Sequence, residues 1–365
     1  MYGAQLIQAL RRRDQSLEFF GVGGPRMREA ACDTVVDAKE LAVVGITEIL
    51  SHLPEIYGCF RRLIAEADRR KPDLAIVIDS PAFNWRVARQ MKLRGIPTVY
   101  YVAPQFWAWR QGRVRLIRKY ITKALVIFPF EEKFYRDRGV DATFVGHPLA
   151  ELPDPPTLRQ AYALQHQLDP TKHWITLMPG SRVKEARMNL PSMLEAAAQL
   201  GKAYEFLLPV APTLSQSFLK EMSQGKKITY VDESLPALRH SRAGIIASGT
   251  ATVEAAMMST PFVMVYRVSP LTYALGKPRI KVPHFAMVNL IAGEKVVPEL
   301  VQADFTADNV VCRVREILPD GPPRTAMLEG FARVRALLRS PNSPVPRSAA
   351  DQAADAVLAL LPRGH

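Results

Sequence analysis

Short, nearly continuous hydrophobic runs alternate with longer amphipathic segments along the chain. In the first half, a helix at residues 2–12 precedes an apolar stretch at 17–22, strands are predicted at 73–79, 97–102, 123–128 and 142–145, and a helix covers 85–94. In the second half, strands are predicted at 174–178, 204–208, 228–231, 243–247 and 262–265, with helices at about 190–200, 250–258 and 307–317. Apolar strands that alternate with helices are typical of doubly wound parallel α/β sheets.

Two segments rich in proline divide this pattern. Residues 148–156 separate the two series of strands, and residues 340–348 precede a final amphipathic helix. We therefore predict a first Rossmann-like domain at residues 1–150 and a second at 157–339. The helix at 349–362 is expected to pack back on the first domain. Ligands of such sheets bind beyond the carboxyl ends of the strands, so the loops there and a cleft between the domains are the expected site.

Composition narrows the class of protein. The 365 residues are 48% hydrophobic and 23% charged, which predicts a folded chain. The longest apolar runs are too short to span a membrane, and the first residues lack the apolar core of a signal peptide, so we expect a cytoplasmic location. Three distant cysteines indicate neither a disulfide framework nor a zinc site. The net charge of +13 suits nucleic acid, anionic lipid or phosphorylated ligands equally.

A glycine-containing turn links the strand at 243–247 to the helix that follows. Ser248, Gly249 and Thr250 form this turn, and Glu254 lies one helical turn further on. Backbone N–H groups at such a turn can hold a pyrophosphate, and a carboxylate in the place of Glu254 can accept both hydroxyl protons of a ribose. The alternative interpretation is an ordinary helix cap followed by a solvated glutamate.

A second turn with the same chemistry follows the strand at 174–178. It contains Ser181 and Arg182, and a guanidinium group can pair with two phosphate oxygens. An exposed arginine beside a Gly-Ser turn is common when it occurs alone. Two turns suited to anions, at adjacent strand ends of one domain, are much stronger evidence for an anion site than either turn alone.

In the first half, Asp79 ends a buried strand. A carboxylate there can act as the base that removes a proton from an attacking hydroxyl, as inverting group transfer requires, but from the residue alone we favour a cap of the next helix. Trp107, Trp109 and Arg110 form an aromatic segment that either lines an acceptor site or packs between helix and sheet. The basic stretch at 110–119 suits a phosphate or a lipid headgroup.

A stripe of apolar residues recurs at helical spacing near residue 57. A core-facing helix is the default interpretation, but large aromatic residues next to arginines also suit an interfacial helix on lipid, which we predict here. The stripe consists of Leu50, Leu53, Ile56, Tyr57, Phe60, Leu63 and Ile64. Leu53, Ile56 and Phe60 are the expected lipid contacts.

Nine motifs, in order along nearly the whole chain, resemble those of the lipid-A-disaccharide synthase family. They lie at residues 21–27, 40–46, 78–84, 104–110, 129–131, 146–148, 179–182, 247–254 and 289–293. The resemblance implies an inverting hexosyltransferase of the GT-B fold. Such an enzyme joins UDP-2,3-diacylglucosamine to 2,3-diacylglucosamine 1-phosphate, giving a β-1,6-linked disaccharide phosphate and UDP.

The resemblance also implies roles for single residues. Asp79 matches the general base, Arg182 a residue needed for activity and Asn289 a polar residue of the cleft, while Ser248 to Glu254 match the nucleotide site. It implies no cofactor beyond the sugar-nucleotide substrate, and the sequence has no Asp-x-Asp pair or His/Cys cluster for a metal. We expect a peripheral protein on the inner face of the inner membrane, with a homodimer left open and no nucleic-acid partner.

Two departures from the family pattern leave alternatives. The usual first strand and Gly-Glu-x-Ser-Gly-Asp loop do not precede the helix at residue 2, so we expect the gene product to extend upstream of Met1. Ala82 replaces a frequent second aspartate, which we infer is not essential. The alternatives are a catalytically impaired protein that binds UDP-sugar or lipid, and a UDP-N-acetylglucosamine 2-epimerase of the same fold. The interpretation as a nucleic-acid binder is supported by the net charge alone.

Overall fold

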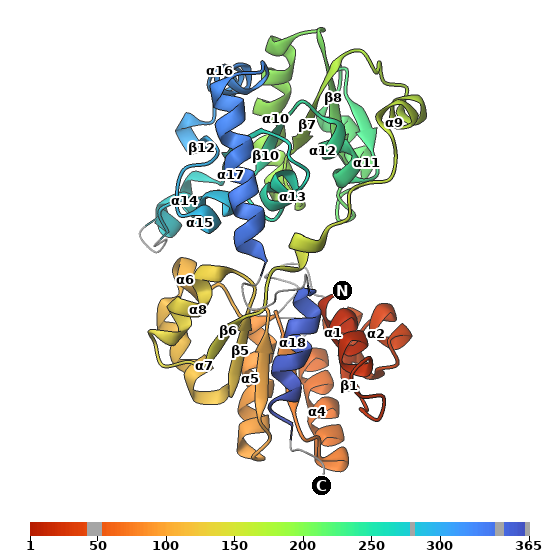
Figure 1. Cartoon of the computed structure of the whole chain (residues 1–365), viewed down its shortest axis with the longest axis vertical. Helices are drawn as coiled ribbons and strands as arrows, with labels where there is room; N and C mark the ends of the chain where they lie inside the picture. The colour runs from red at the N-terminus through yellow and green to blue at the C-terminus, as the bar shows by residue number, and fades with distance from the viewer. Residues whose placement is uncertain (42–52, 278–281, 340–346, 362–365) are drawn as a thin grey trace. The chain divides into compact units, whose positions relative to one another are not determined.

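The computed structural model describes residues 1–41, 53–277, 282–339 and 347–361. Internal contacts divide the chain into two units. Unit 1 comprises Met1–Pro148 and Arg339–His365, and unit 2 comprises Leu149–Leu338. Each unit is an α/β structure with parallel strands and is described by itself (Figure 1).

Unit 1 contains two parallel sheets. The first pairs β1 (Phe20–Gly23) with β2 (Asp33–Asp37), and the second has the order β3-β4-β5-β6, formed by Ala75–Ile78, Thr98–Tyr101, Lys123–Val126 and Ala142–Phe144. Its helices are α1 (Tyr2–Arg11), α2 (Pro25–Glu29), α4 (Leu53–Arg70), α5 (Pro81–Leu93), α6 (Phe106–Trp109), α7 (Val114–Tyr120), α8 (Pro129–Arg136) and α18 (Ala349–Leu358).

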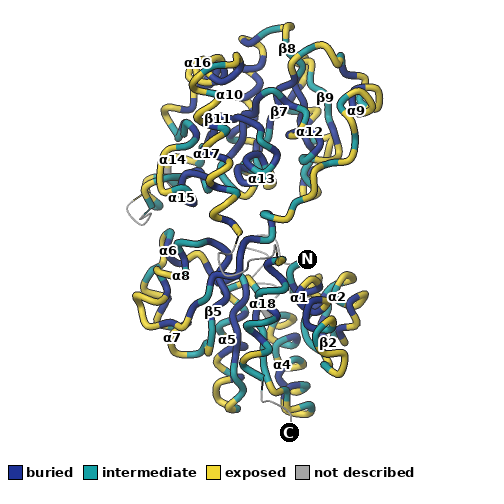
Figure 2. The backbone as a smooth tube through the Cα atoms, in the orientation of Figure 1, coloured by how far each residue is buried: buried dark blue, intermediate teal, exposed yellow. Residues whose placement is uncertain are grey.

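The sequence explains most of these elements. All four residues of β4 are buried, as the largely apolar run predicts, and three of the four residues of its neighbour β5 are buried as well (Figure 2). Proline occupies the first turn of both α5 and α8, where its fixed φ angle suits a helix and its missing N–H costs nothing. That proline also corrects the predicted start of α5, which lies at Pro81 and not at residue 85. Similarly, only the end of the apolar stretch at 17–22 belongs to β1.

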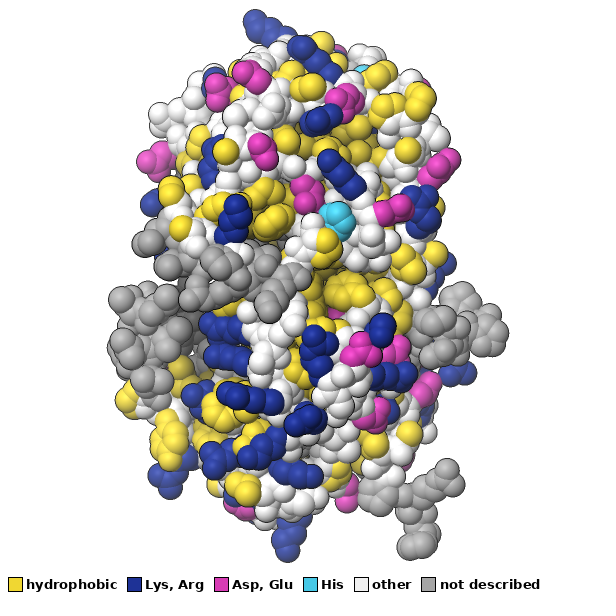
Figure 3. All heavy atoms as spheres, turned by 90° about the vertical axis from the view of Figure 1, so that its left-hand side faces the viewer, with side chains coloured by type: hydrophobic (Ala, Val, Ile, Leu, Met, Phe, Trp, Pro, Cys, Tyr) yellow, Lys and Arg dark blue, Asp and Glu magenta, His cyan; other side chains and the backbone are white. Residues whose placement is uncertain are grey.

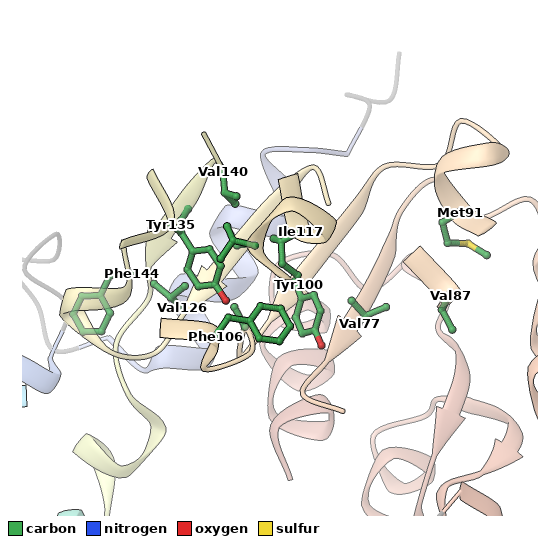
Figure 4. Packing of buried hydrophobic residues seen from close by; sticks show 14 of the residues in the cluster. Val77, Val87, Met91, Tyr100, Phe106, Ile117, Val126, Tyr135, Val140 and Phe144 are labelled. Carbon is green, nitrogen blue, oxygen red and sulfur yellow. The ribbon is translucent and has the colours of Figure 1, made fainter. Parts of the chain in front are cut away.

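The core of unit 1 lies between the four-stranded sheet and its helices. Tyr100, Val126 and Phe144 project from the strands against Ile117 of α7 and Tyr135 of α8 (Figure 4). The Tyr135 hydroxyl donates to the carbonyl of Pro104, so this large polar side chain is satisfied although fully buried.

A cavity of about 500 Å³ is lined by residues of both β1 and β3, including Val22 and Ile78. Among the described strands, β1 pairs only with β2, and β3 pairs only with β4. The two-stranded and four-stranded sheets are therefore separate.

The last helix of the chain packs against the first (Figure 1). Arg13, two residues after the end of α1, donates to Asp351 at 2.9 Å and to Asp355 at 2.5 Å. Ser348 caps α18 by accepting from the backbone N–H of Asp351 and donating back to its carboxylate. Burial raises the pKa of Asp351, but hydrogen bonds from Ser348, Arg13 and Arg12 outweigh this effect and hold the pKa well below its usual value.

Unit 2 contains one six-stranded parallel sheet of order β12-β11-β10-β7-β8-β9. The strands are β7 (His173–Met178), β8 (Tyr204–Pro209), β9 (Thr229–Val231), β10 (Ala243–Ala247), β11 (Phe262–Tyr266) and β12 (Glu299–Val301). The helices are α9 (Arg159–His166), α10 (Val183–Leu200), α11 (Gln216–Met222), α12 (Ser234–His240), α13 (Ala251–Met257), α14 (Pro270–Gly276), α15 (Met287–Ala292), α16 (Ala307–Ile317) and α17 (Pro322–Leu338).

The strand order of unit 2 reverses between β7 and β10. From β7 the chain proceeds outward to β8 and β9, then returns to β10 on the other side and continues to β11 and β12. The crevice beyond the carboxyl ends of two such strands is the usual ligand position in open parallel sheets. Both turns singled out from the sequence, after Met178 and after Ala247, lie at this position.

Within the described part of the chain, every helix is too short or too polar to cross a lipid bilayer.

The contact between α1 and α18 gives a prediction about stability. Because the folded pKa of Asp351 is depressed, its contribution is present above the unfolded pKa near 3.8 and is lost as the pH falls toward the folded value. We expect Asp351→Asn to lower the unfolding free energy by about 1 kcal/mol at neutral pH. The difference from wild type should shrink below pH 4 in urea unfolding.

Asp137→Asn is a matched control, because Asp137 forms an exposed ion pair with Lys133 on α8. It should change the unfolding free energy by less than about 0.5 kcal/mol. An Asp351→Asn effect no larger than this control would show that α18 is held by its apolar face alone.

Candidate nucleotide-sugar site

A pocket of about 740 Å³ lies at the carboxyl ends of the strands of unit 2. This volume is typical of small-molecule sites. Four loops converge on it although they are far apart in the sequence, because parallel strands bring their carboxyl ends to one edge of the sheet. The lining consists of residues 178–182, 209–212, 232–236 and 247–251, with Glu185 and Glu254.

The turn after β10 offers open backbone to the pocket. Gly249 has φ +149°, which side chains rarely adopt, and no atom lies within 4 Å of the place where a Cβ would stand. The hydroxyl of Thr252 donates to the carbonyl of Gly249 at 2.8 Å, which fixes the turn from inside α13. Ser248, Gly249 and Thr250 all line the pocket, as predicted for the nucleotide site.

The turn after β7 is closely packed and carries an exposed cation. Gly180 has φ +113°, and an added Cβ would lie 2.8 Å from the Cβ of Glu185, so glycine is required. Arg182 is 81% exposed at its side chain and donates to Glu185 at 2.9 Å. Ser181 and Arg182 therefore lie at the pocket, next to the amino end of the 18-residue helix α10, where the helix dipole favours anions.

Glu254 reaches the pocket from the first turn of α13. The hydroxyl of Ser234, at the start of α12, donates to its carboxylate at 3.2 Å. Burial raises the pKa of Glu254, and the Ser234 hydrogen bond acts in the opposite direction. The carboxylate is thus held in place, with acceptor capacity left for a ligand.

The hydroxyl of Ser248 forms a hydrogen bond within the protein, so a ligand would not be its only partner. Its hydroxyl donates to the carbonyl of Phe285 at 2.8 Å. The carboxylate of Glu299 accepts from the backbone N–H groups of Phe285 and Ala286. Asn289 in turn donates to Glu299 at 2.9 Å. A chain of hydrogen bonds thereby anchors the turn after β10 to β12.

Asn289 itself is fully buried and does not line the pocket. Its amide oxygen accepts from the backbone N–H groups of Val296 and Val297, and its amide nitrogen donates to Val297 and Glu299. All of its hydrogen-bonding capacity is therefore used inside unit 2. The prediction of Asn289 as a catalytic residue is corrected by this placement: it supports the site from behind.

Asn189 supports the turn after β7, as Asn289 supports the turn after β10. It lies on the buried face of α10, donates to the carbonyl of Pro179 at 3.0 Å and accepts from the backbone N–H of Arg267 at 3.0 Å. Sequence analysis missed it. The available signal was a polar residue on the apolar face of an amphipathic helix, a place where asparagine persists only when its hydrogen bonds are satisfied.

In unit 1, Asp79 directly follows β3 and is exposed. Asp79 and Ser80 have φ angles of +50° and +37°, a pair of left-handed conformations that cost energy and are concentrated at functional sites. The Asp79 carbonyl accepts from Asn84 at 2.6 Å and from the Tyr100 hydroxyl at 2.5 Å, which hold this backbone. Ser80, not Asp79, occupies the N-cap of α5, so the alternative role of a helix cap is not seen.

The aromatic segment divides into a buried and an exposed part. Trp107 is 6% exposed, packs edge-on against Phe130 and donates to Glu131 at 2.7 Å. Packing, the alternative interpretation, therefore describes Trp107. Trp109 is 49% exposed, and the Arg110 guanidinium lies 3.8 Å above its ring. Only Trp109 and Arg110 offer a surface to an acceptor or lipid.

The apolar stripe is largely a core-facing stripe. Ile64 is buried, and Phe60 and Leu63 pack on the core of unit 1, with Phe60 edge-on to Phe83. The prediction of lipid contact is therefore wrong for Phe60, because the helix needs this face to cover the sheet. Ile56 is half-buried and Tyr57 exposed. Leu50 and the side chain of Leu53 lie outside the described residues.

Among the described residues, no three His, Cys, Asp or Glu side chains are grouped to hold a metal ion.

Glu131, a fully buried carboxylate that the sequence analysis placed in a family motif without assigning it a role, gives a pH prediction. Burial raises its pKa to about 7, although Trp107 and the N–H groups of Phe128 and Ile127 favour the charged form. The stability that it contributes is complete below the unfolded pKa near 4.5 and is lost as the pH rises through 7.

Glu131→Gln removes this titration. Relative to the variant, the wild type should lose on the order of 3 kcal/mol of unfolding free energy between pH 4.5 and 8. Urea unfolding of both proteins across this range measures the difference. A constant difference would show that the three N–H donors keep the carboxylate charged throughout.

The sequence profile of the lipid-A-disaccharide synthetase family matches residues 1–330. Lipid-A-disaccharide synthase of Koribacter versatilis is 50% identical over 368 residues, covering 100% of this chain and 96% of that protein. The enzyme of Myxococcus xanthus is 40% identical, covering 100% of this chain and 95% of that protein.

Among solved structures, the glycotransferase of kitacinnamycin superposes with a TM-score of 0.63 at 16% identity, covering 99% of this chain and 97% of that chain. The calicheamicin glycosyltransferase CalG4 superposes with a TM-score of 0.61 at 16% identity, covering 98% and 94%. The structural likeness confirms the GT-B fold, and the sequence matches show that the chain belongs to the lipid-A-disaccharide synthase family.

Proposed function

We propose that the chain transfers 2,3-diacylglucosamine from UDP to the 6-hydroxyl of 2,3-diacylglucosamine 1-phosphate, with inversion at C1. The products are a β-1,6-linked disaccharide 1-phosphate, a lipid A precursor, and UDP. The observation that carries this proposal is the pocket at the β7–β10 switch point, which combines two glycine turns, Arg182 and Glu254 in a chain of this family.

The donor nucleotide is held in unit 2. Glu254 accepts hydrogen bonds from the ribose hydroxyls, and the backbone of Gly249 approaches the diphosphate closely. Arg182 exchanges its present partner, Glu185, for phosphate oxygens, which are better bidentate acceptors. Arg182, the backbone N–H groups at Gly249 and the helix dipole neutralise the charge that develops on UDP as it leaves, so transfer proceeds without a bound metal.

The acceptor hydroxyl is activated by Asp79. Its carboxylate removes the hydroxyl proton while the oxygen attacks C1, and the C1–O bond to UDP breaks with its electron pair going to the diphosphate. The exposure of Asp79 and its backbone, held by Asn84 and Tyr100, support this role. The proton finishes on Asp79, from which solvent removes it.

A bilayer contact is proposed for the face of unit 1 that carries α5 to α7. Residues 80–130 contain ten lysines and arginines but no aspartate or glutamate. The cations are Arg86, Arg89, Lys92, Arg94, Arg110, Arg113, Arg115, Arg118, Lys119 and Lys123. Among ion pairs of the described residues, only Arg94 and Lys123 have carboxylate partners. Figure 3 shows Lys and Arg side chains gathered on one face of unit 1. This surface suits anionic headgroups of the inner face of the inner membrane.

The two carboxylates of the proposed mechanism should differ in kinetics. Asp79 acts only in the transition state, so Asp79→Ala should lower kcat about 10²–10⁴-fold and leave UDP affinity nearly unchanged. Glu254 binds ground and transition states alike, so Glu254→Ala should mainly raise the donor KM. Disaccharide formation is measured with both purified lipid substrates.

Asp73→Ala is the matched control, since Asp73 is exposed two residues before the start of β3, at the opposite end of that strand. It should retain wild-type kinetics. Near-normal turnover of Asp79→Ala would remove Asp79 from the mechanism. Turnover of the UDP-sugar at full rate without acceptor would instead identify an epimerase.

The bilayer contact is tested by sedimentation with vesicles containing phosphatidylglycerol. Each cation near an anionic surface contributes about 1 kcal/mol, so Arg113→Gln with Arg115→Gln should weaken binding roughly 30-fold at low salt. The control is Lys133→Gln with Arg136→Gln on α8, where Asp137 and Glu132 already pair the cations. Equal losses for both pairs would show attraction by net charge and not by this face.

A further inference from the structure

Unit 2 has a second cavity, of about 450 Å³, at the amino ends of its strands. It is lined by Tyr204 and Phe206 of β8, by Thr229 of β9 and by the last turns of α10. The donor pocket lies at the carboxyl ends of the same strands, so the sheet separates the two sites. The volume falls within the range of small-molecule sites.

The floor of this cavity is apolar. Leu194 and Ala197 of α10 and Phe206 of β8 are buried residues of the lining, and Ile228 is half-buried beside them. Gly201 and Gly225, at the turns that lead into β8 and toward β9, have φ angles of +86° and +76°, and an added Cβ at either would meet no atom within 4 Å. The mouth of the cavity is therefore not closed by side chains at these turns.

The rim is basic. Lys172, Lys202, Lys226 and Lys227 line the cavity from three separate loops. Its one acidic lining residue, Glu205, is already engaged, since it accepts from the backbone N–H of Asp169 at 2.8 Å and lies 4.0 Å from Lys227. Asp169 lies near Lys172 and accepts from Thr171. Among ion pairs of the described residues, Lys202 and Lys226 have no carboxylate partner.

We propose that this cavity binds an anionic amphiphile with a phosphate head and an alkyl chain, at a site separate from the donor pocket. The lysines neutralise the head, and the floor of Leu194, Ala197 and Phe206 removes part of the chain from water. The two parts of the ligand match the two parts of the cavity. A free phosphate would leave the apolar floor without a partner, and a neutral alkyl chain would leave the lysine rim without one.

The test is calorimetric titration of the full chain with dodecyl phosphate below its micellar concentration, in the presence of saturating UDP. We expect binding to persist with UDP bound, because the sites are on opposite edges of the sheet. Lys202→Gln with Lys226→Gln should weaken binding at least about 10-fold, since two charge-assisted contacts are lost. Ala198→Trp, at an exposed lining position of α10, should abolish it by filling the cavity.

The control is Lys220→Gln with Lys295→Gln, which removes the same charge from exposed positions of unit 2 outside the cavity. It should bind as the wild type does. Equal weakening by the control pair would overturn the proposal in favour of general electrostatic attraction. Equal affinity for inorganic phosphate or for dodecyl maltoside would also overturn it, because each probe carries only half of the proposed chemistry.

Discussion

The parallel pairing of β7 with β10 is the constraint on which the candidate site depends. Parallel neighbours must be joined by crossovers, and in unit 2 the crossovers leave this pair in opposite directions. The helices that follow the two strands therefore diverge, and the turns that begin them border a crevice. Gly180 and Gly249 stand at these turns with φ angles that other residues rarely adopt, so the backbone, and not a set of long side chains, shapes the pocket.

A pocket made of backbone needs support from behind, and buried asparagines supply it. Asn189 holds Pro179 and the residue after β11 together, while Asn289 and Glu299 hold the segment to which Ser248 donates. Each amide is fully buried and hydrogen-bonded through both its nitrogen and its oxygen, and removing one partner of such a buried polar group costs far more than the hydrogen bond contributes net. These residues act on a ligand only through the turns, which distinguishes them from Arg182 and Glu254 at the pocket surface.

Sequence patterns predicted what depends on neighbours in the chain. The alternation of strands and helices, both glycine turns and the approach of Glu254 to Thr250 are local features, and the structure has them at the predicted places. The errors concern residues whose surroundings are set by distant segments. Phe60 and Trp107 belong to motifs that fit either a ligand or the core, and only their contacts with Phe83 and Glu131 assign them to the core. Asn289 was assigned to the cleft by resemblance to the family, yet its partners lie on β12 and the loop before it. The roles of Asp79 and Arg182 in turnover remain predictions.

The positive charge of the chain is concentrated in one segment. This concentration has a physical effect that the net charge alone does not have. Residues 80–130 carry ten cations and no acidic residue, which is +10 of the net +13. Charges spread evenly over a surface are screened within about 8 Å at physiological ionic strength, whereas a concentrated group makes a local potential that orients an approaching anion. Trp109 beneath Arg110, and Leu93 at 69% exposure, add apolar surface to this cationic segment. We expect a surface with both properties to discriminate between a dissolved phosphate and a phosphate attached to acyl chains, because only the second gains from burying hydrocarbon as well as from pairing charge.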